Sequence, residues 1–188
     1  RFTRSRAGTR YRVTLSPRPD NSCASGTVSI HNAETYKDME KSVVLAVDDD
    51  VVQLEIIKKA ASELEFPAID VRTAENVREA ETVLTGETVD MVITDQRMPD
   101  GTAFDILKRS IEVNPLVPVV VITAFESVQD AVSLLKKGVK DYIVKPLRPH
   151  DIQQIIINWL EWHHRERDVR DATEEQADRG DAPSTFGD

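Results

Sequence analysis

Polar side chains that could handle a phosphoryl group and a divalent cation follow several apolar segments of the sequence. The side chains in this position are Asp48, Asp49, Asp50, Asp95, Thr123 and Lys145. Three neighbouring carboxylates repel one another, and a hard cation such as Mg2+ relieves that repulsion. A carboxylate beside the cation can attack phosphorus, while a hydroxyl and an ammonium can stabilise charge on the phosphoryl oxygens. These residue types therefore suit phosphoryl transfer to a carboxylate, provided that the fold brings them together.

Alternating apolar and amphipathic segments indicate which elements would position these side chains. We expect strands at 43–47, 68–71, 89–94, 118–123 and 141–144. Segments with helical periodicity follow them in turn, at 51–65, 75–85, 102–113, 127–137 and 149–167. This alternation predicts the α/β class, with a doubly wound, five-stranded parallel sheet and five helices. Sites in such sheets lie beyond the carboxyl ends of the strands, so the candidate side chains should meet at one edge.

Four segments, taken in order, resemble the response-regulator receiver domains of two-component signalling. They are 44–50, 90–101, 120–124 and 141–147. We place the receiver domain at 41–166, and the resemblance implies a flavodoxin-like sheet with strand order 2-1-3-4-5. Residues 122–132 further resemble receivers of the nitrogen-regulation type, in which an AAA+ ATPase and a helix-turn-helix domain usually follow. The chain is then expected to be a stand-alone receiver or the receiver fragment of an AAA+ transcriptional activator.

The resemblance assigns the metal and phosphoryl chemistry to particular residues. It implies that Asp95 is the phosphoacceptor, and that Asp49 and Asp95 bind Mg2+ directly. The backbone carbonyl of Arg97 would be a third protein ligand. Asp48 would act mainly through a metal-bound water. Mg2+ is therefore the expected cofactor.

The resemblance also implies which residues hold and sense the phosphoryl group. Thr123 and Lys145 would hold it, and Tyr142 lies at the switch-aromatic position of the family. Thr123 would move toward the phosphoryl group, and Tyr142 would fill the space that it leaves. The Lys145-Pro146 peptide bond is expected to be cis, as in the family. Partner preference would then change at the face formed by the fourth helix, the fifth strand and the fifth helix.

The implied partners are a sensor histidine kinase or phosphotransfer protein and a second copy of the chain, bound through that face. No enzymatic turnover is expected beyond Mg2+-dependent self-phosphorylation and dephosphorylation. The net charge of -9 disfavours direct nucleic-acid binding by the receiver, since the phosphate backbone attracts Lys and Arg. A single cysteine and the lack of an apolar run near ~20 residues predict a cytoplasmic protein without a membrane span. His163 and His164 are expected at an exposed or partner-contacting end of the last helix.

The segments on either side of the receiver differ in composition. Residues 1–40 are predicted to form a disordered basic arm, with six Arg and no acid in residues 1–18. Residues 167–188 are predicted to form an acidic, disordered tail or a linker. The chain begins with Arg1, so Met39 is a candidate start.

Two alternatives to a phosphorylatable receiver remain open. Asp48 and Asp50 after an apolar strand also resemble the nucleophile motif of haloacid-dehalogenase-like phosphatases, although Asp95 and Thr123 then have no clear role. A degenerate receiver that acts only as a binding module is the other alternative. Asp50 taken alone is predicted to be a helix N-cap.

Overall fold

The computed structural model describes residues 41–64, 68–124 and 127–178, so the basic arm, Met39 and residues 179–188 lie outside the described part. The strands are β1 (Ser42–Val47), β2 (Ile69–Ala74), β3 (Met91–Thr94), β4 (Arg97–Met98), β5 (Gly101–Thr102), β6 (Val119–Thr123) and β7 (Asp141–Val144). The helices are α2 (Val51–Ser62), α3 (Val77–Gly86), α4 (Ala103–Val113), α5 (Val128–Lys136) and α6 (Pro149–Asp178).

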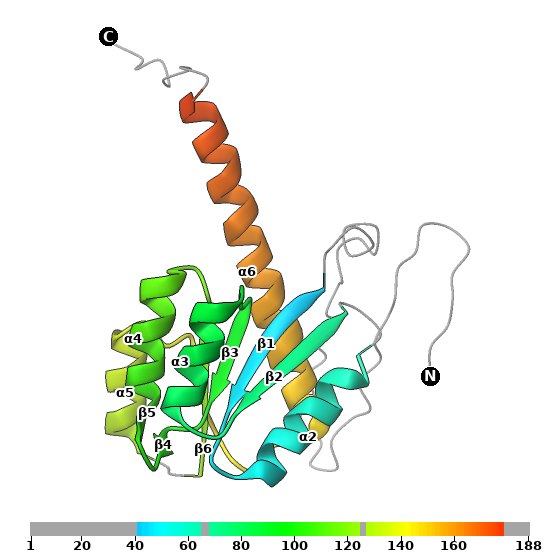
Figure 1. Ribbon diagram of the computed structural model, residues 1–188, viewed down its shortest axis with the longest axis vertical. Helices are drawn as coiled ribbons and strands as arrows, with labels where there is room; N and C mark the ends of the chain where they lie inside the picture. The colour runs from blue at the N-terminus through cyan, green and yellow to red at the C-terminus, as the bar shows by residue number, and fades with distance from the viewer. Residues whose placement is uncertain (1–40, 65–67, 125–126, 179–188) are drawn as a thin grey trace, which may run out of the picture. The chain divides into compact units, whose positions relative to one another are not determined.

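Five of the strands form one parallel sheet in the order β2-β1-β3-β6-β7 (Figure 1). The fold class and the strand order are confirmed, because β6 and β7 are the fourth and fifth long strands along the chain. A short antiparallel hairpin of β4 and β5 follows β3 and was not predicted. The reversal of strand order lies beside β1 and β3, where ligands bind in open sheets of this kind.

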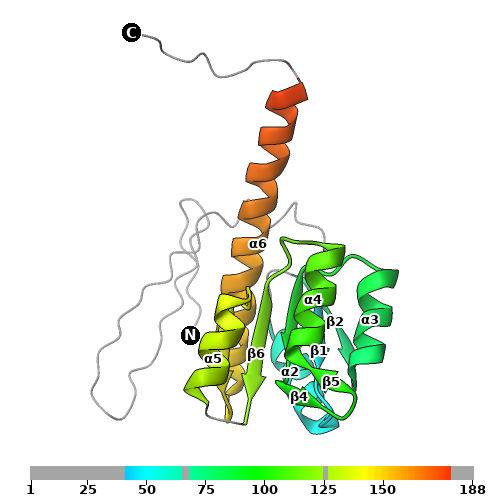
Figure 2. The same cartoon turned by 90° about the vertical axis from the view of Figure 1, so that its left-hand side faces the viewer.

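Both faces of the sheet are covered by helices, which explains why its strands are almost wholly apolar. Alternate side chains of β1 enter different cores, since successive residues of a strand point to opposite faces. Leu45 and Val47 pack with residues of α3 and α4, whereas Val44 and Ala46 pack with residues of α2 and α6. Figures 1 and 2 show the two helix layers on either side of the sheet. The carboxyl edge of the sheet is thus left for polar side chains.

Local capping fixes where the helices next to the site begin. The Asp50 side chain accepts a hydrogen bond from the Val52 amide at 2.9 Å, so its predicted role as the N-cap of α2 is confirmed. A reciprocal capping box between Thr102 and Asp105 starts α4 directly after the β4–β5 hairpin. These caps tie the helix starts to the loops that follow β1 and β3.

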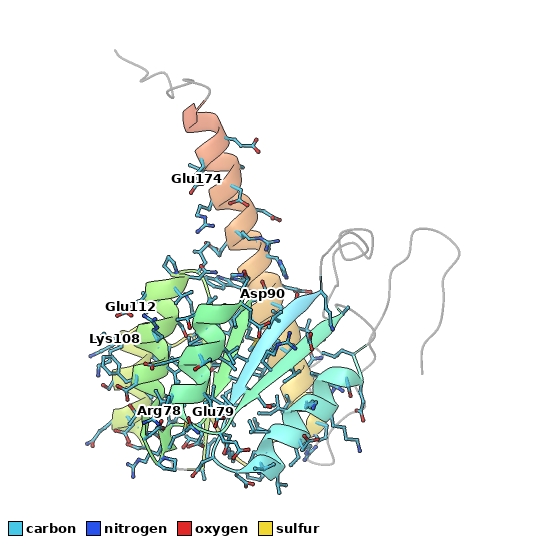
Figure 3. All side chains as sticks on the ribbon, viewed as in Figure 1. Arg78, Glu79, Asp90, Lys108, Glu112 and Glu174 are labelled. Atoms are coloured by element: carbon cyan, nitrogen blue, oxygen red, sulfur yellow. The ribbon has the colours of Figure 1, made fainter. Side chains whose placement is uncertain are left out.

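Helix α6 is longer than its apolar periodicity predicts. That periodicity ends near residue 167, but the helix continues to Asp178, although the side chains at 165–175 are exposed. No glycine or proline interrupts this stretch, and Arg170 pairs with Glu174 one turn further on, with 3.7 Å between Nε and Oε1 (Figure 3). None of the helices in the described ranges combines the length and the apolar composition that a membrane span requires.

The expectation that His163 lies at an exposed or partner-contacting end of the last helix was wrong. Its side chain is buried, with Nδ1 3.1 Å from the Leu116 carbonyl and Nε2 3.6 Å from Asp90 Oδ1. Asp90 in turn accepts a hydrogen bond from the Val43 amide at 2.7 Å. This polar cluster joins α6 to the amino-terminal ends of β1 and β3, opposite the carboxyl edge. Its partners are distant in sequence, so helical periodicity alone could not reveal it.

Candidate functional site

The carboxyl ends of four strands deliver the predicted side chains to one edge of the sheet. Asp48 follows the last residue of β1, and Asp95 follows the last residue of β3. Thr123 ends β6, and Lys145 follows the last residue of β7. Since all four strands are parallel, their polar end residues converge as predicted.

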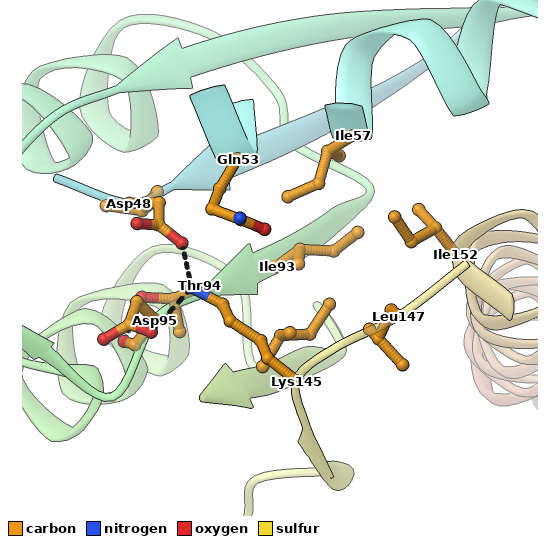
Figure 4. A pocket seen from close by; sticks show the side chains of 11 residues that line it. Asp48, Gln53, Ile57, Ile93, Thr94, Asp95, Lys145, Leu147 and Ile152 are labelled. Carbon is orange, nitrogen blue, oxygen red and sulfur yellow. Dashed lines mark hydrogen bonds and ion pairs between the residues drawn. The ribbon is translucent and has the colours of Figure 1, made fainter. Parts of the chain in front are cut away.

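Lys145 links the two buried carboxylates of the site (Figure 4). Its Nζ lies 2.6 Å from Asp48 Oδ2 and 3.1 Å from Asp95 Oδ1. Asp48 is 3% exposed and Asp95 is 8% exposed, so little water screens these contacts. One ammonium therefore compensates two carboxylates, which leaves the site with a formal excess of negative charge.

Burial and the ion pairs shift the pKa values of Asp48 and Lys145 in opposite directions. Burial raises the pKa of the Asp48 carboxyl, and the hydrogen bond from Lys145 offsets only part of that effect. Burial also lowers the pKa of the Lys145 ammonium, but its hydrogen bonds to Asp48 and Asp95 outweigh burial, so its net pKa is raised. Lys145 is therefore charged at neutral pH.

Backbone amides hold the other oxygen of each carboxylate. Asp48 Oδ1 accepts from the Asp50 amide at 3.0 Å, and Asp95 Oδ2 accepts from the Arg97 amide at 2.8 Å. Each carboxylate thus has one oxygen toward Lys145 and one oxygen toward the peptide two residues further on. These bonds fix the orientation of both side chains. A fixed orientation suits a carboxylate that must react with an incoming group in one geometry.

The predicted metal ligands are brought together only in part. Asp48 and Asp95 face the site, whereas Asp49 is exposed and borders a neighbouring depression lined also by Glu75, Asn76, Arg78, Pro99 and Asp100. No group of three His, Cys, Asp or Glu side chains that could hold a metal ion is found in the described ranges. Asp49 lies beyond the end of β1, in the turn that leads into α2, and it borders this depression instead of the site. A carboxylate pair still suits Mg2+, which binds few protein ligands and keeps several waters.

Thr123 ends β6, the strand that pairs with β3, and Tyr142 lies on the next strand, β7. Tyr142 has a partner that the sequence did not reveal. Thr123 is fully buried, and Tyr142 is half-buried. The Tyr142 hydroxyl donates to Gln96 Oε1 at 2.9 Å, and burial raises the pKa of that hydroxyl. Gln96 directly follows Asp95 and is itself buried. The only hint of this bond in the sequence was a residue with a side-chain amide just after a predicted strand. The predicted cis peptide bond between Lys145 and Pro146 is present.

The loop after Asp95 is fastened to the start of α3, which was also not predicted. Asp100 Oδ1 accepts from the Val77 amide at 2.9 Å, and its Oδ2 accepts from the Arg78 amide at 3.1 Å. A Cβ atom on Gly101 would lie 2.8 Å from Val77 Cγ2, so only glycine fits there without displacement of its neighbours. The β4–β5 hairpin is therefore held at a fixed position beside the site.

Comparison with known proteins identifies the family. The profile described as "Response regulator receiver domain" matches residues 44–157, which is more than half of the chain. The chain belongs to the response regulator receiver domain family. This membership favours the receiver hypothesis over a haloacid-dehalogenase-like phosphatase.

Individual relatives agree with this receiver domain in sequence and in fold. Response regulator protein PilR of Pseudomonas aeruginosa is 31% identical over 122 residues, which cover 65% of this chain and 27% of PilR. Two-component response regulator ORR3 of Oryza sativa subsp. indica is 33% identical over 114 residues, which cover 60% of this chain and 86% of ORR3. The crystal structure of a CheY-like response regulator receiver domain protein from Methanospirillum hungatei matches with a TM-score of 0.61 and 26% identity, covering 68% of this chain and 99% of that one. The chain thus spans about a quarter of PilR but most of ORR3.

Proposed function

We propose that this receiver domain is a phosphorylation-dependent signalling switch in which Asp95 accepts the phosphoryl group. The observation that carries the proposal is the position of Lys145 Nζ, 3.1 Å from Asp95 and 2.6 Å from Asp48. An ammonium in this position can neutralise charge on a phosphoryl group attached to Asp95. The buried hydroxyl of Thr123 ends the adjacent strand, where it can donate to a second phosphoryl oxygen.

In the proposed transfer, an Asp95 carboxylate oxygen attacks the phosphorus of a phosphohistidine on a sensor histidine kinase or phosphotransfer protein. The oxygen–phosphorus bond forms, the nitrogen–phosphorus bond breaks, and the imidazole leaves with the electron pair and takes up a proton. Mg2+, when bound, supplies positive charge that stabilises the phosphoryl oxygens. Asp48 and Asp95, the two carboxylates that face the site, would hold it together with the Arg97 carbonyl. Apart from its own phosphorylation and dephosphorylation, the chain turns over no substrate in this proposal.

The output of the switch would be a changed preference for partners at the surface of α5, β7 and α6. Phosphorylation adds roughly two negative charges at Asp95. Thr123 would move toward them, and Tyr142 would move into the space that it leaves. The same surface is our candidate for a homodimer interface, and light scattering with and without a phosphoryl analogue tests it.

Binding of the phosphoryl analogue beryllofluoride with Mg2+ tests the proposed acceptor. Isothermal titration calorimetry of the full chain should show saturable, Mg2+-dependent binding that Asp95→Ala abolishes. Asp70→Ala is the matched control, because Asp70 lies in a surface ion pair with Lys41 and should not affect binding. Binding that survives Asp95→Ala would overturn the assignment. Steady hydrolysis of a generic phosphate ester would instead support the phosphatase alternative.

We also propose that the receiver is of the nitrogen-regulation type and serves a longer transcriptional regulator. The motif at 122–132 supports the subgroup. Transcriptional regulatory protein ZraR of Escherichia coli, which is 32% identical over 121 residues that cover 27% of its length, supports a longer transcriptional regulator. The complete reading frame is the test, and an AAA+ ATPase segment after the receiver is the expected result.

A further inference from the structure

Gln96 joins three parts of the site through its buried side chain. Its Oε1 accepts from the Tyr142 hydroxyl at 2.9 Å, and its Nε2 donates to Asp130 Oδ2 on α5 at 3.0 Å. An ionised Asp130 can only accept, so the amide nitrogen of Gln96 must face it and the amide oxygen must face Tyr142. The three side chains form an ordered hydrogen-bonded chain that starts at the residue directly after Asp95.

The backbone of Gln96 is fixed, whereas α5 is held less firmly. The Gln96 carbonyl accepts from the Ala103 amide at 3.0 Å, which anchors this residue to the start of α4. Helix α5 buries a single side chain, Leu134, while α4 buries four. A helix with so little buried apolar surface can shift at low cost, so one hydrogen bond to its first turn has a large effect on its position.

We infer that Gln96 is a positioning residue that holds Tyr142 and α5 in the arrangement of the unphosphorylated state. The inference rests on the proposed function, because it gives the phosphoryl group at Asp95 a route to the α5 surface. The Tyr142 hydroxyl also forms a hydrogen bond with Thr123, so it is shared between Thr123 and Gln96. When Thr123 moves toward the phosphoryl group, a Tyr142 side chain that follows it loses the bond to Gln96. The same movement leaves Gln96 Oε1 without the hydrogen bond from Tyr142. The Gln96 side chain is then less firmly oriented, which weakens its hydrogen bond to Asp130. Phosphorylation and α5 are thereby coupled through two hydrogen bonds.

Because these bonds stabilise one state and not the other, their removal should favour the phosphorylated arrangement. Gln96→Leu and Tyr142→Phe should each tighten the binding of beryllofluoride with Mg2+ to the full chain, by roughly 2- to 12-fold for each hydrogen bond to Gln96 that is lost. Gln96→Leu removes two such bonds and Tyr142→Phe removes one. The double variant should gain less than the product of the two single effects, because both changes break the same chain.

Matched variants separate coupling from a general loss of structure. Gln153→Leu is the control, since Gln153 Nε2 also bridges two elements, donating to the Ala60 carbonyl at 3.1 Å, but lies away from Tyr142. It should leave beryllofluoride affinity unchanged. Asp130→Asn keeps an oxygen that accepts from Gln96 and should bind like the wild type, whereas Asp130→Ala should bind more tightly. This pair of variants tests the hydrogen-bonded chain of Tyr142, Gln96 and Asp130 even where Gln96→Leu does not fold.

The outcomes distinguish the inference from the proposed function on which it rests. If the wild type binds beryllofluoride and Gln96→Leu, Tyr142→Phe and Asp130→Ala bind with the same or lower affinity, the inference is wrong. Multiplicative effects in the double variant would also overturn it. If the wild type itself does not bind, the proposed function fails instead. Faster amide hydrogen exchange across α5 in Asp130→Ala, but not in Gln153→Leu, is the independent structural result that we expect.

Discussion

Removal of the Lys145 ammonium should destabilise the fold in a pH-dependent way. Lys145→Met keeps most of the aliphatic side chain but leaves Asp48 and Asp95 buried without their shared cation. Removing one partner of a buried ion pair typically costs about 3–5 kcal/mol, because the remaining charge is uncompensated. We expect the free energy of unfolding at neutral pH to fall by about this amount.

The direction of the pH dependence follows from the two pKa shifts. The pKa of Lys145 is raised, so its stabilising effect is complete at neutral pH and is lost only as pH rises through its folded value, above the ordinary 10.5. Burial raises the pKa of Asp48 above 3.8, so its charge destabilises the fold as pH rises through the folded value. Without Lys145 that pKa rises further. The deficit of Lys145→Met should therefore shrink as pH is lowered from neutral toward the raised pKa of Asp48, where its carboxyl takes up a proton.

Urea unfolding followed by circular dichroism between pH 5 and pH 8 measures this effect. Lys41→Met is the matched control, because Lys41 pairs with Asp70 at 3.1 Å on the surface and its side chain is 58% exposed. Its loss should cost less than about 1 kcal/mol at every pH. In Lys145→Met, an additional Asp48→Asn substitution should restore part of the lost stability. Equal losses in the two lysine variants, or a deficit independent of pH, would refute the reasoning.

Two further predictions concern carboxylates outside the site. Asp90→Ala should lower the free energy of unfolding by about 1–3 kcal/mol, because it leaves the His163 ring and the Val43 amide without a buried acceptor. Burial raises the pKa of Asp90, but its hydrogen bonds outweigh burial and lower the net pKa, so this stabilisation is complete above pH 3.8 and is lost as pH falls through the folded value. Acid unfolding that is identical in wild type and variant would contradict this. Asp100→Ala should speed amide hydrogen exchange at Val77 and Arg78, since it removes the acceptor of both amides, and unchanged protection would show that the hairpin is held by other contacts.

The main architecture could be predicted from the sequence because it depends on local patterns. Each apolar segment was short enough to be a strand, and parallel strands must bring their carboxyl ends to one edge. Asp48, Asp95 and Lys145 each directly follow such a segment, so their convergence followed from the sheet alone. The strand order itself came from the resemblance to the receiver family, since local patterns do not encode which strands pair.

The features that were missed depend on contacts between distant residues. The bond from Gln96 to Tyr142 spans 46 positions, and that from Asp100 to Val77 spans 23. Nothing in a local window distinguishes these polar residues from ordinary loop residues. The exposed position of Asp49 was missed for another reason, because the direction of a side chain at a strand end depends on how the chain turns into the next helix.

The far end of α6 moves more than its base when the helix tilts, because α6 extends well beyond the sheet. The helix is anchored on the sheet by Ile156, Leu160 and His163, and it then continues without interruption to Asp178. At 1.5 Å per residue, the stretch after His163 is roughly 22 Å long. A tilt of about 10° at the anchored end would displace the far end by roughly 4 Å. A small rearrangement of the sheet would therefore become a larger change in position at Asp178.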